Sequence, residues 1–529
     1  MRININKWIY GGLLALFLLP VAISCEKDKI DEEFVPERMF TPAAINIALT
    51  NSDAILSWNR SLFAAGQETY TLEVSTDSMF QSTAHISVEI DSLRYIVAET
   101  DVVPGTKYFA RLRANATESS EASHWVYSES FIITGQVLLL PVEPGDLAAT
   151  SVTLKWDPGV VTHIMLNGVR HDITPAEAAA REKTITGLTE KTEYEASLFN
   201  NTLTRGMRDF RTRAMTPTGP LVVVLGANDS LGAMLKTAVD GNIFVLPQGS
   251  QQFYNDPITL PAGISVTIFG EDVPEKPVVA LNGITLPATA GTITFENVDI
   301  TGYQENDETK SKRNYIFNQS AATATDQVIF ENCIVRNFTN TPFRIQSSNP
   351  ITINKVVFSR CVVYDCGDNG ANGTYAMIHS NVATGKVNNI EITNSTIYKI
   401  GYSIILHNSA PSQSVLIENC TFYNVVGNGR YFVDYNAQSA GSFTVRNCII
   451  GKTLSPAESS RGIRAGSSYT VDNTYKTADA IISSNPITNI IDYPQNSTEL
   501  WANPASGDFT IIDNTFPGRT NAGDPRWRP

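Results

Sequence analysis

Residues 293–303 read ITFENVDITGY, and the pattern of this segment returns six more times along the second half of the chain. Each copy has an apolar residue, one spacer, a polar pivot and then a small residue of the kind found in protein cores. The copies recur about every 29 residues, within the range of stacked structural repeats. We therefore expect a solenoid rather than a set of separate domains. The other copies are VIFENCIVRNF (328–338), VVFSRCVVYDC (356–366), IEITNSTIYKI (390–400), VLIENCTFYNV (415–425), FTVRNCIIGKT (443–453) and YTVDNTYKTAD (469–479).

The pivot of each copy predicts a sharp bend between two short strands. Residues of core type alternate with polar ones on both sides of the pivot, as in strands with one buried face. Asn tolerates the left-handed backbone conformation that such a bend requires. The pivots are Asn297, Asn332, Arg360, Asn394, Asn419, Asn447 and Asn473.

A third strand is expected in every coil. Three strands per coil, each paired with its counterpart in the next coil at ~4.8 Å, describe a right-handed parallel β-helix. We place this domain at residues 220–480, with a short amphipathic helix in 230–241 covering its start and residues 481–529 capping its end. The third-strand segments are NYIFNQ, PFRIQS, YAMIHS, SIILHN and YFVDYN.

Residues 38–135 and 136–214 have the pattern of two consecutive β-sandwiches. Each places a Trp on an early strand, Trp58 in AILSW and Trp156 in VTLKW. Each then places a Tyr where a corner tyrosine would lie, Tyr108 and Tyr194. This order resembles fibronectin type III domains. No chemistry is evident in them, so we expect them to act as spacers.

The N-terminal 24 residues combine basic residues with a short apolar run, and they end in AIS before Cys25. This arrangement resembles a bacterial lipoprotein signal, in which Cys25 would carry the lipid anchor and hold the chain to a membrane. The alternative is a signal peptide without lipidation. Residues 25–37 would then form an acidic tether, similar to export signals of lipoproteins on the outer surface of some Gram-negative bacteria.

The remaining cysteines and the overall charge limit the function. Four cysteines fall in one expected inward column and only Cys366 is expected in a loop, so neither a disulfide nor a zinc site is predicted. The formal net charge of −14 argues against nucleic acid as a partner. The inward cysteines are Cys333, Cys361, Cys420 and Cys448.

The outward residues after the cysteine column form a ladder that contains three tyrosines on adjacent rungs. An aromatic strip of this kind suits sugar rings, whose C–H faces pack on aromatic side chains. The alternative is that stacked identical residues stabilise the coils and bind nothing. The ladder reads Thr301, Arg336, Tyr364, Tyr398, Tyr423 and Gly451.

A second outward column is expected along the third strand, with Asn318, Gln346, His379, His407 and Tyr435, and with Arg344 one step away. Resemblance to pectate-lyase-like folds implies that this strand and the loops before it form the substrate groove. Arginines on the strand and loops would bind the carboxylates of a uronic-acid polymer. The two histidines fit equally well as solvated ladder residues. The charged loop residues are Lys310, Lys312, Arg313, Asp365, Asp368, Arg430 and Arg461.

A complete catalytic set is not evident. Calcium-dependent lyases need several acidic oxygens around one ion, and only Asp365, Asp368 and Asp434 lie near the expected groove. The NTD, DD and GHG strings of glycosidases with this fold do not occur. We expect no metal or cofactor, with calcium only if the protein is a lyase. If it is an enzyme, Arg344, His379 and His407 are the candidate catalytic residues.

The whole layout resembles surface lipoproteins of polysaccharide-utilisation systems, in which fibronectin type III domains precede a pectate-lyase-like β-helix of unknown function. The closing stretch LWANPASGDFTIIDNTFPGRTNAGDPRW (500–527) carries this resemblance most specifically. Together with the predicted lipid anchor, the spacer domains, the tyrosine strip and the Arg-rich loops, it leads us to expect an outer-membrane protein, facing the cell exterior, that binds an acidic polysaccharide and passes it to enzymes and an importer. A divergent lyase or hydrolase and a purely structural or adhesive protein remain the alternatives.

Overall fold

A computed structural model describes residues 36–528, apart from 51, 63–67, 306, 308, 310, 368–372 and 455–458. Cys25 and the predicted signal lie outside this part of the chain. The chain divides into two compact units, one comprising the residues up to Val137 with Thr202–Arg205, the other comprising Leu138–Asn201 and the chain from Gly206 onward. No helix in the described residues is long and apolar enough to cross a membrane.

The first sandwich is built from two antiparallel sheets around its own core. One sheet has the order β1-β2-β5, and the other has β4-β3-β6-β7 with β8 also paired to β6. Trp58 is buried, and the Tyr108 hydroxyl accepts the Val103 N–H at 3.0 Å, which is the predicted tyrosine corner. The strands are β1 (Asn46–Leu49), β2 (Asp53–Ser57), β3 (Tyr70–Ser75), β4 (Ile86–Ile90), β5 (Arg94–Ala98), β6 (Lys107–Ala114), β7 (Val126–Tyr127) and β8 (Phe131–Ile132).

The second sandwich repeats this design with shorter sheets, β12-β9 and β11-β10-β13-β14. Trp156 is buried, and the Tyr194 hydroxyl accepts the Thr189 N–H at 2.9 Å. Both fibronectin type III-like sandwiches are therefore confirmed. The elements are β9 (Ser151–Lys155), β10 (His163–Leu166), β11 (Val169–Asp172), α1 (Pro175–Ala180), β12 (Glu182–Thr186), β13 (Glu193–Asn200) and β14 (Leu203–Arg211).

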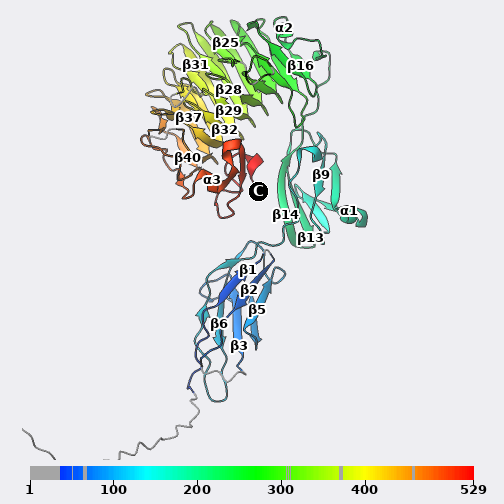
Figure 1. Ribbon diagram of the computed structural model, residues 1–529, viewed down its shortest axis with the longest axis vertical. Helices are drawn as coiled ribbons and strands as arrows, with labels where there is room; N and C mark the ends of the chain where they lie inside the picture. The colour runs from blue at the N-terminus through cyan, green and yellow to red at the C-terminus, as the bar shows by residue number, and fades with distance from the viewer. Residues whose placement is uncertain are drawn as a thin grey trace, which may run out of the picture. The chain divides into compact units, whose positions relative to one another are not determined.

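The rest of the chain forms the predicted parallel β-helix, whose coils each contribute one strand to three parallel sheets (Figure 1). Sheet 1 contains β15 (Val222–Val224), β16 (Asn242–Leu246), β19 (Val266–Gly270), β22 (Thr289–Glu296), β25 (Thr323–Glu331), β28 (Ile351–Ser359), β31 (Gly385–Thr393), β34 (Ser412–Glu418), β37 (Ala440–Arg446) and β40 (Thr470–Asp472). Sheet 2 contains β17 (Gln251–Tyr254), β20 (Val278–Leu281), β23 (Asp299–Thr301), β26 (Ile334–Arg336), β29 (Val362–Cys366), β32 (Thr396–Ile400), β35 (Thr421–Val425), β38 (Ile449–Ile450), β41 (Tyr475–Lys476) and β42 (Ile491–Asp492). Sheet 3 contains β18 (Ile258–Thr259), β21 (Ile284–Thr285), β24 (Phe317–Gln319), β27 (Phe343–Ile345), β30 (Ile378–Ser380), β33 (Ile405–His407), β36 (Tyr431–Asp434) and β39 (Arg461–Arg464).

The corner between sheets 1 and 2 is the bend that the pivots predict. All seven pivots have positive φ, from 41° at Asn473 to 58° at Asn297. Asn side chains of neighbouring coils are also hydrogen-bonded, as between Asn419 Nδ2 and Asn394 Oδ1 at 2.9 Å. The amide therefore supplies both the backbone conformation and a link between coils.

The interior of the solenoid is continuous and apolar. Phe295, Phe330 and Phe358 stack on successive rungs of sheet 1, with ring centroids 5.3 and 4.5 Å apart. The four cysteines of the predicted inward column are buried and free. The prediction for Cys366 was wrong, because it lies at the end of β29 and is buried rather than in a loop.

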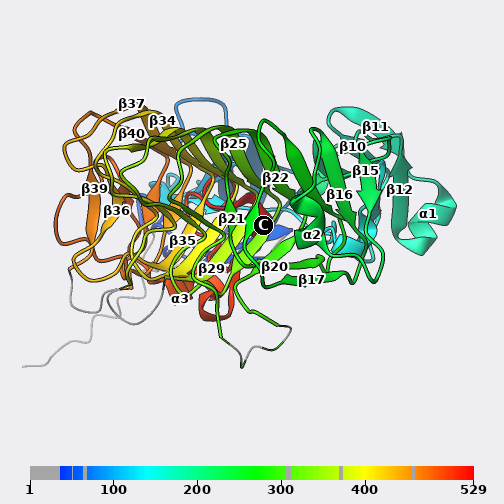
Figure 2. The same ribbon diagram turned by 90° about the horizontal axis from the view of Figure 1, so that it is seen from above.

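A short helix covers the start of the solenoid, as predicted. Helix α2 (Leu231–Leu235) begins after Ser230, whose side chain accepts the Ala233 N–H. Leu231 and Leu235 are fully buried in the core of the solenoid. Figure 2 shows α2 beside the first strands.

The chain after Gln495 does not cap the last coil but runs back along sheet 2. We call residues 496–528 the C-terminal strap; it contains α3 (Ser497–Leu500), β43 (Trp501–Asn503) and β44 (Asp508–Ile511). Its end crosses consecutive coils. Gly523 N–H donates to Asn447 O, Trp527 Nε1 to Thr396 Oγ1, and Arg526 to Arg360 O. The expectation of an end cap is corrected here, because the apolar side chains of the strap pack on the flank of the solenoid.

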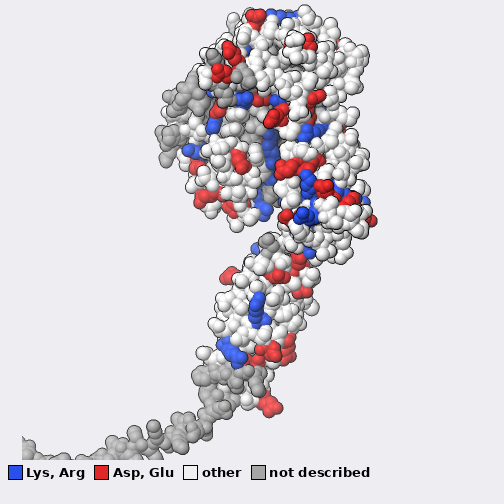
Figure 3. Space-filling model, turned by 45° about the vertical axis from the view of Figure 1, so that its right-hand side comes forward, with Lys and Arg blue, Asp and Glu red and all other residues white. Residues whose placement is uncertain are grey.

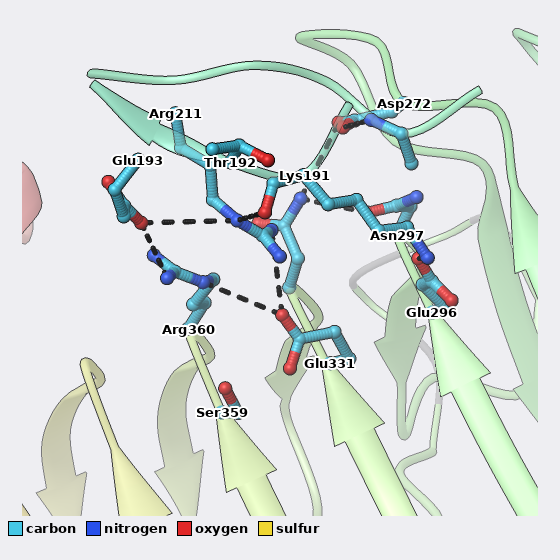
Figure 4. Close-up of polar contacts among 12 residues, drawn as sticks. Lys191, Thr192, Glu193, Arg211, Asp272, Glu296, Asn297, Glu331, Ser359 and Arg360 are labelled. Atoms are coloured by element: carbon cyan, nitrogen blue, oxygen red, sulfur yellow. Dashed lines mark hydrogen bonds and ion pairs between the residues drawn. The ribbon is translucent and has the colours of Figure 1, made fainter. Parts of the chain in front are cut away.

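The second sandwich and the β-helix belong to one compact unit and meet through ion pairs (Figure 4). Lys191 pairs with Glu296 at 2.5 Å, and Arg211 lies 3.6 Å from Glu331. Arg360 reaches Glu193 at 2.5 Å and Glu331 at 3.6 Å. Arg360, the pivot that is not Asn, thus forms an ion pair with the second sandwich.

Candidate functional site

The tyrosine ladder has the predicted register. Thr301, Arg336, Tyr364, Tyr398 and Tyr423 are paired on successive strands of sheet 2. The rings of Tyr364 and Tyr398 are stacked with centroids 4.9 Å apart and planes at 12°.

This ladder is nevertheless not an open platform for sugars. Tyr398 and Tyr423 are each only 7% exposed, because Trp501 and Phe509 of the C-terminal strap pack against them. Burial also raises the pKa of Tyr398 far above its ordinary value. The prediction that Tyr364, Tyr398 and Tyr423 form an exposed binding strip is corrected: Tyr398 and Tyr423 are core residues of the strap interface, and Tyr364 is a half-buried residue packed against that core.

Arg336, the other polar residue assigned to this strip, is also engaged. Its guanidinium binds the Asp299 carboxylate on the neighbouring strand, with Nε–Oδ1 at 2.9 Å and an amino nitrogen to Oδ2 at 3.0 Å. An arginine would bind the carboxylate of a ligand through the same two-point geometry, which Arg336 already uses for Asp299.

The predicted column on sheet 3 mixed residues from two faces. His407 pairs with Ser380, and Leu406 is the residue level with His379. A shift of one residue moves a side chain to the opposite face of a strand. His407 and Tyr435 therefore point into the coil, where both are completely buried, and Gln346 follows β27 rather than lying on it.

The inward residues have partners of their own. His407 Nε2 accepts the Val387 N–H at 3.0 Å, and Nδ1 lies 2.8 Å from Ala410 O. Burial lowers the pKa of His407 to about 4. The Tyr435 hydroxyl is 2.8 Å from Ser412 Oγ. The set Arg344, His379 and His407 is consequently not assembled on one surface.

The structure instead brings together another outward column on sheet 3. Adjacent strands place Asn318 beside Arg344, Arg344 beside His379 and, two coils on, Asp434 beside Arg464. Asp434 is paired through both oxygens with Arg464, at 2.8 Å each. This carboxylate is already neutralised.

Four tyrosines at the start of the third strands complete this surface. The Arg344 guanidinium carbon lies 4.2 Å from the Tyr375 ring centroid, Arg430 lies 4.2 Å from Tyr402, and Arg464 lies 4.2 Å from Tyr431. Cation–π contacts of this kind hold each guanidinium flat on a ring. We call this surface the Tyr–Arg face; it consists of Tyr315, Arg344, Tyr375, His379, Tyr402, Arg430, Tyr431, Arg461 and Arg464.

Sequence reasoning missed these tyrosines, although a signal was present. A Tyr precedes three of the third strands by two or three residues, in NYIF, TYAMI and GYSII, and a Tyr begins a fourth, in RYFV. The ladder on sheet 2 drew attention because its tyrosines share one register position. Three of those on sheet 3 lie in the entering turns, where period-2 patterns do not apply, and Tyr431 is the first residue of β36.

His379 lies at the base of the Tyr–Arg face and is 3% exposed. Its Nδ1 accepts the Ala376 N–H at 3.2 Å, which leaves the proton of the neutral ring on Nε2. Burial and then the charge of Arg344 lower the pKa of His379 to about 3. Rings of Tyr375 and Tyr402 lie edge-on to it, with centroids 4.9 and 6.2 Å away.

Several polar atoms of this region have no hydrogen-bond partner among the described residues. They are Asn318 Oδ1, Arg344 Nε, His379 Nε2 and Arg430 Nε. An unpaired buried polar group costs about 1–3 kcal/mol. In a native structure such groups call for an explanation, such as an ordered water or a bound ion.

The charges of the face are mostly uncompensated. In the described part of the chain, no carboxylate lies within ion-pair distance of Arg344, Arg430 or Arg461. Lys310 and Asp368, which were expected in the adjoining loops, lie outside the described residues. Those same residues contain no group of three or more His, Cys, Asp and Glu side chains arranged to hold a metal ion.

Comparisons with known proteins identify two domains in the solenoid and its C-terminal strap. Residues 254–400 match a family model described as Domain of unknown function (DUF4957), and residues 415–527 match Domain of unknown function (DUF5123). Neither description names an activity. A search of curated proteins found no match.

Solved structures match a third of the chain at low similarity. Chicken CNTN1 FN1–FN3 domains are 13% identical over 34% of this chain and 68% of that chain, with a TM-score of 0.16. The central fibronectin-III array of RIM-binding protein is 15% identical over 34% of this chain and 72% of that chain, with a TM-score of 0.13. The chicken interferon gamma receptor alpha chain is 14% identical over 33% of this chain and 98% of that chain, with a TM-score of 0.17. The strand pairing itself shows two fibronectin type III-like sandwiches and a parallel β-helix, and the two domains of unknown function cover coils of that β-helix and most of the C-terminal strap.

Proposed function

We propose that this protein binds an acidic polysaccharide along the Tyr–Arg face of sheet 3. The observation that carries the proposal is the alternation of tyrosine rings and uncompensated arginines on consecutive coils. Tyrosine rings pack on the C–H faces of sugars, and guanidinium groups bind carboxylates. Because coils repeat at ~4.8 Å, the face offers such groups at regular steps to an extended polymer.

The placement of this binding surface in the cell is part of the proposal. The N-terminal sequence that resembles a lipoprotein signal, with Cys25 as lipid anchor, supports attachment to the outer membrane facing the exterior. In this scheme the first sandwich and the tether connect the β-helix to the membrane. Bound glycan would pass to neighbouring enzymes and an importer.

Affinity electrophoresis tests the proposal directly. Residues 26–529 should be retarded in native gels that contain pectic or other uronate-rich polymers and should migrate normally with neutral polymers. Replacing Tyr375 or Arg344 by Ala should abolish most of the retardation. Tyr127→Ala, at a residue that is 53% exposed on the first sandwich, is the matched control.

The same gels separate the alternatives. New reducing ends or unsaturated products would indicate a lyase or hydrolase, and only Arg344 and His379 of the three catalytic candidates would be positioned to take part. Normal migration with every polymer, without products, would overturn the proposal and favour a structural or adhesive role.

A further inference from the structure

A second polar recess lies away from sheet 3, where the second sandwich, the pivot corner and the C-terminal strap meet. It is a pocket of about 380 Å³, within the roughly 300–1,000 Å³ usual for ligand sites. Figure 3 shows Lys and Arg side chains gathered in the recess between the sandwich and the β-helix. The basic residues that line the pocket are Arg211, Arg213, Lys276, Arg360 and Arg526.

Two of the four acidic groups in this pocket are paired with cations. Glu193 pairs with Arg360, and Asp524 pairs with Arg526 at 3.0 Å and accepts the Thr396 hydroxyl at 2.7 Å. Asp272 accepts the Ala214 N–H at 2.9 Å and faces Asn332 Nδ2, which are both neutral donors, so its negative charge remains near Lys276. The remaining acid is Asp209, which is exposed.

Two cations of the pocket keep their charge uncompensated. Within the described part of the chain, the Arg213 guanidinium donates only to backbone carbonyls, those of Asp272 and Pro144. Among the described residues no carboxylate lies within ion-pair distance of Lys276 Nζ. Burial lowers the pKa of Lys276, and the nearby charge of Asp272 opposes this shift only in part.

We propose that this pocket binds a small oxyanion, a carboxylate, sulfate or phosphate group on a molecule no larger than a monosaccharide. Lys276 from the β19–β20 loop and Arg213 from the second sandwich would hold its charge. Arg526 of the strap lines the same pocket, so the bound anion would join three parts of the unit. The site lies at the corner between sheets 1 and 2, so the proposal does not depend on glycan binding by sheet 3.

Calorimetric titration of residues 26–529 at constant ionic strength tests this site. The probes are galacturonate, phosphate and sulfate, with galactose and chloride as uncharged and weakly coordinating controls. At least one oxyanion should bind, and Lys276→Met should weaken it about tenfold or more. Lys386→Met, at an exposed lysine on β31, should bind as the wild type does.

Asn394→Asp provides a second test in case Lys276→Met does not fold. Asn394 lines the pocket, and Asp tolerates the positive φ of this pivot while adding a negative charge. This variant should also lose affinity for the anion. Binding of galacturonate alone would identify a sugar acid, and binding of phosphate or sulfate alone an inorganic or ester oxyanion. No binding of any anion at about 10 mM, or equal binding by all variants, would overturn the proposal.

Discussion

His379 and His407 follow one another along sheet 3 but face opposite sides of it. His379 is level with Leu406 on the outer face, while His407 is level with Ser380 inside the coil. Both histidines are neutral at ordinary pH, because burial disfavours the charged ring. His407 uses both nitrogens within the fold, whereas His379 keeps Nε2 without a partner among the described residues. Of the two histidines, only His379 lies on the outer face of sheet 3.

The stability of the protein should depend on pH through His407. Its pKa is lowered to about 4 in the folded state, below the ~6.5 of an unfolded histidine. Between these values the unfolded chain binds a proton that the folded chain does not, so stability falls as pH drops from ~6.5 towards 4. By about pH 5 the loss is on the order of 2 kcal/mol.

Replacing His407 by Gln removes this titration. The gap in urea unfolding free energy between wild type and His407→Gln should therefore narrow by roughly 2 kcal/mol between about pH 7 and pH 5. An unchanged gap would mean that the folded state accepts the proton after all.

At the scale of the elements, the C-terminal strap turns an outward column of tyrosines into a second apolar core. Phe509 lies against both Tyr398 and Tyr423, with ring centroids 5.4 and 5.8 Å away. Trp501 is completely buried and adds an edge contact to Tyr423. The strap thereby covers strands of sheet 2 that would otherwise expose aromatic rings.

Tyr423→Ala should loosen the strap without affecting glycan binding. Loss of a large buried aromatic side chain costs about 3 kcal/mol or more. Hydrogen exchange of residues 496–528 should rise in the variant, and retardation in polysaccharide gels should stay at the wild-type level. Tyr127→Ala is again the exposed control, and a loss of retardation in Tyr423→Ala alone would return the ladder to the binding site.

The solenoid was predictable from sequence because its signals are local. A pivot such as Asn332 and its flanking alternation lie within one segment, and all seven pivots have the expected positive φ. The faces of sheet 3 were harder to predict. Its strands are two to four residues long, and the histidines of YAMIHS and SIILHN align in sequence one position away from their pairing in space. The covering of Tyr398 was not predictable, because its cover comes from residues about a hundred positions later.

At the scale of the whole molecule, ion pairs fix the second sandwich to the β-helix, so this sandwich is not a free spacer. Six pivots carry Asn, and the seventh, Arg360, reaches across to Glu193 on β13. Glu331 on β25 also faces both Arg211 and Arg360. The second sandwich and the β-helix each contribute both acidic and basic residues to this junction, and these face opposite charges across it.

Arg360→Asn should weaken this junction while preserving the corner, since Asn is the residue at the other pivots. In a double-mutant cycle with Glu193→Gln, the coupling energy should be about 0.5–1 kcal/mol at low salt. It should shrink at about 1 M salt because exposed ion pairs are screened. Zero coupling at low salt would show that the pair does not hold the two bodies together.

Because the corner repeats, a single coil could be duplicated or deleted during evolution without disturbing its neighbours. Every coil begins and ends at the same backbone conformation, so a duplication or deletion from one pivot to the next, such as residues 394–418, joins like to like. Such an event would lengthen or shorten sheet 3 by one step of ~4.8 Å and leave the remaining rungs in register. The number of coils would then set the length of ligand that a homologue with such a change can bind.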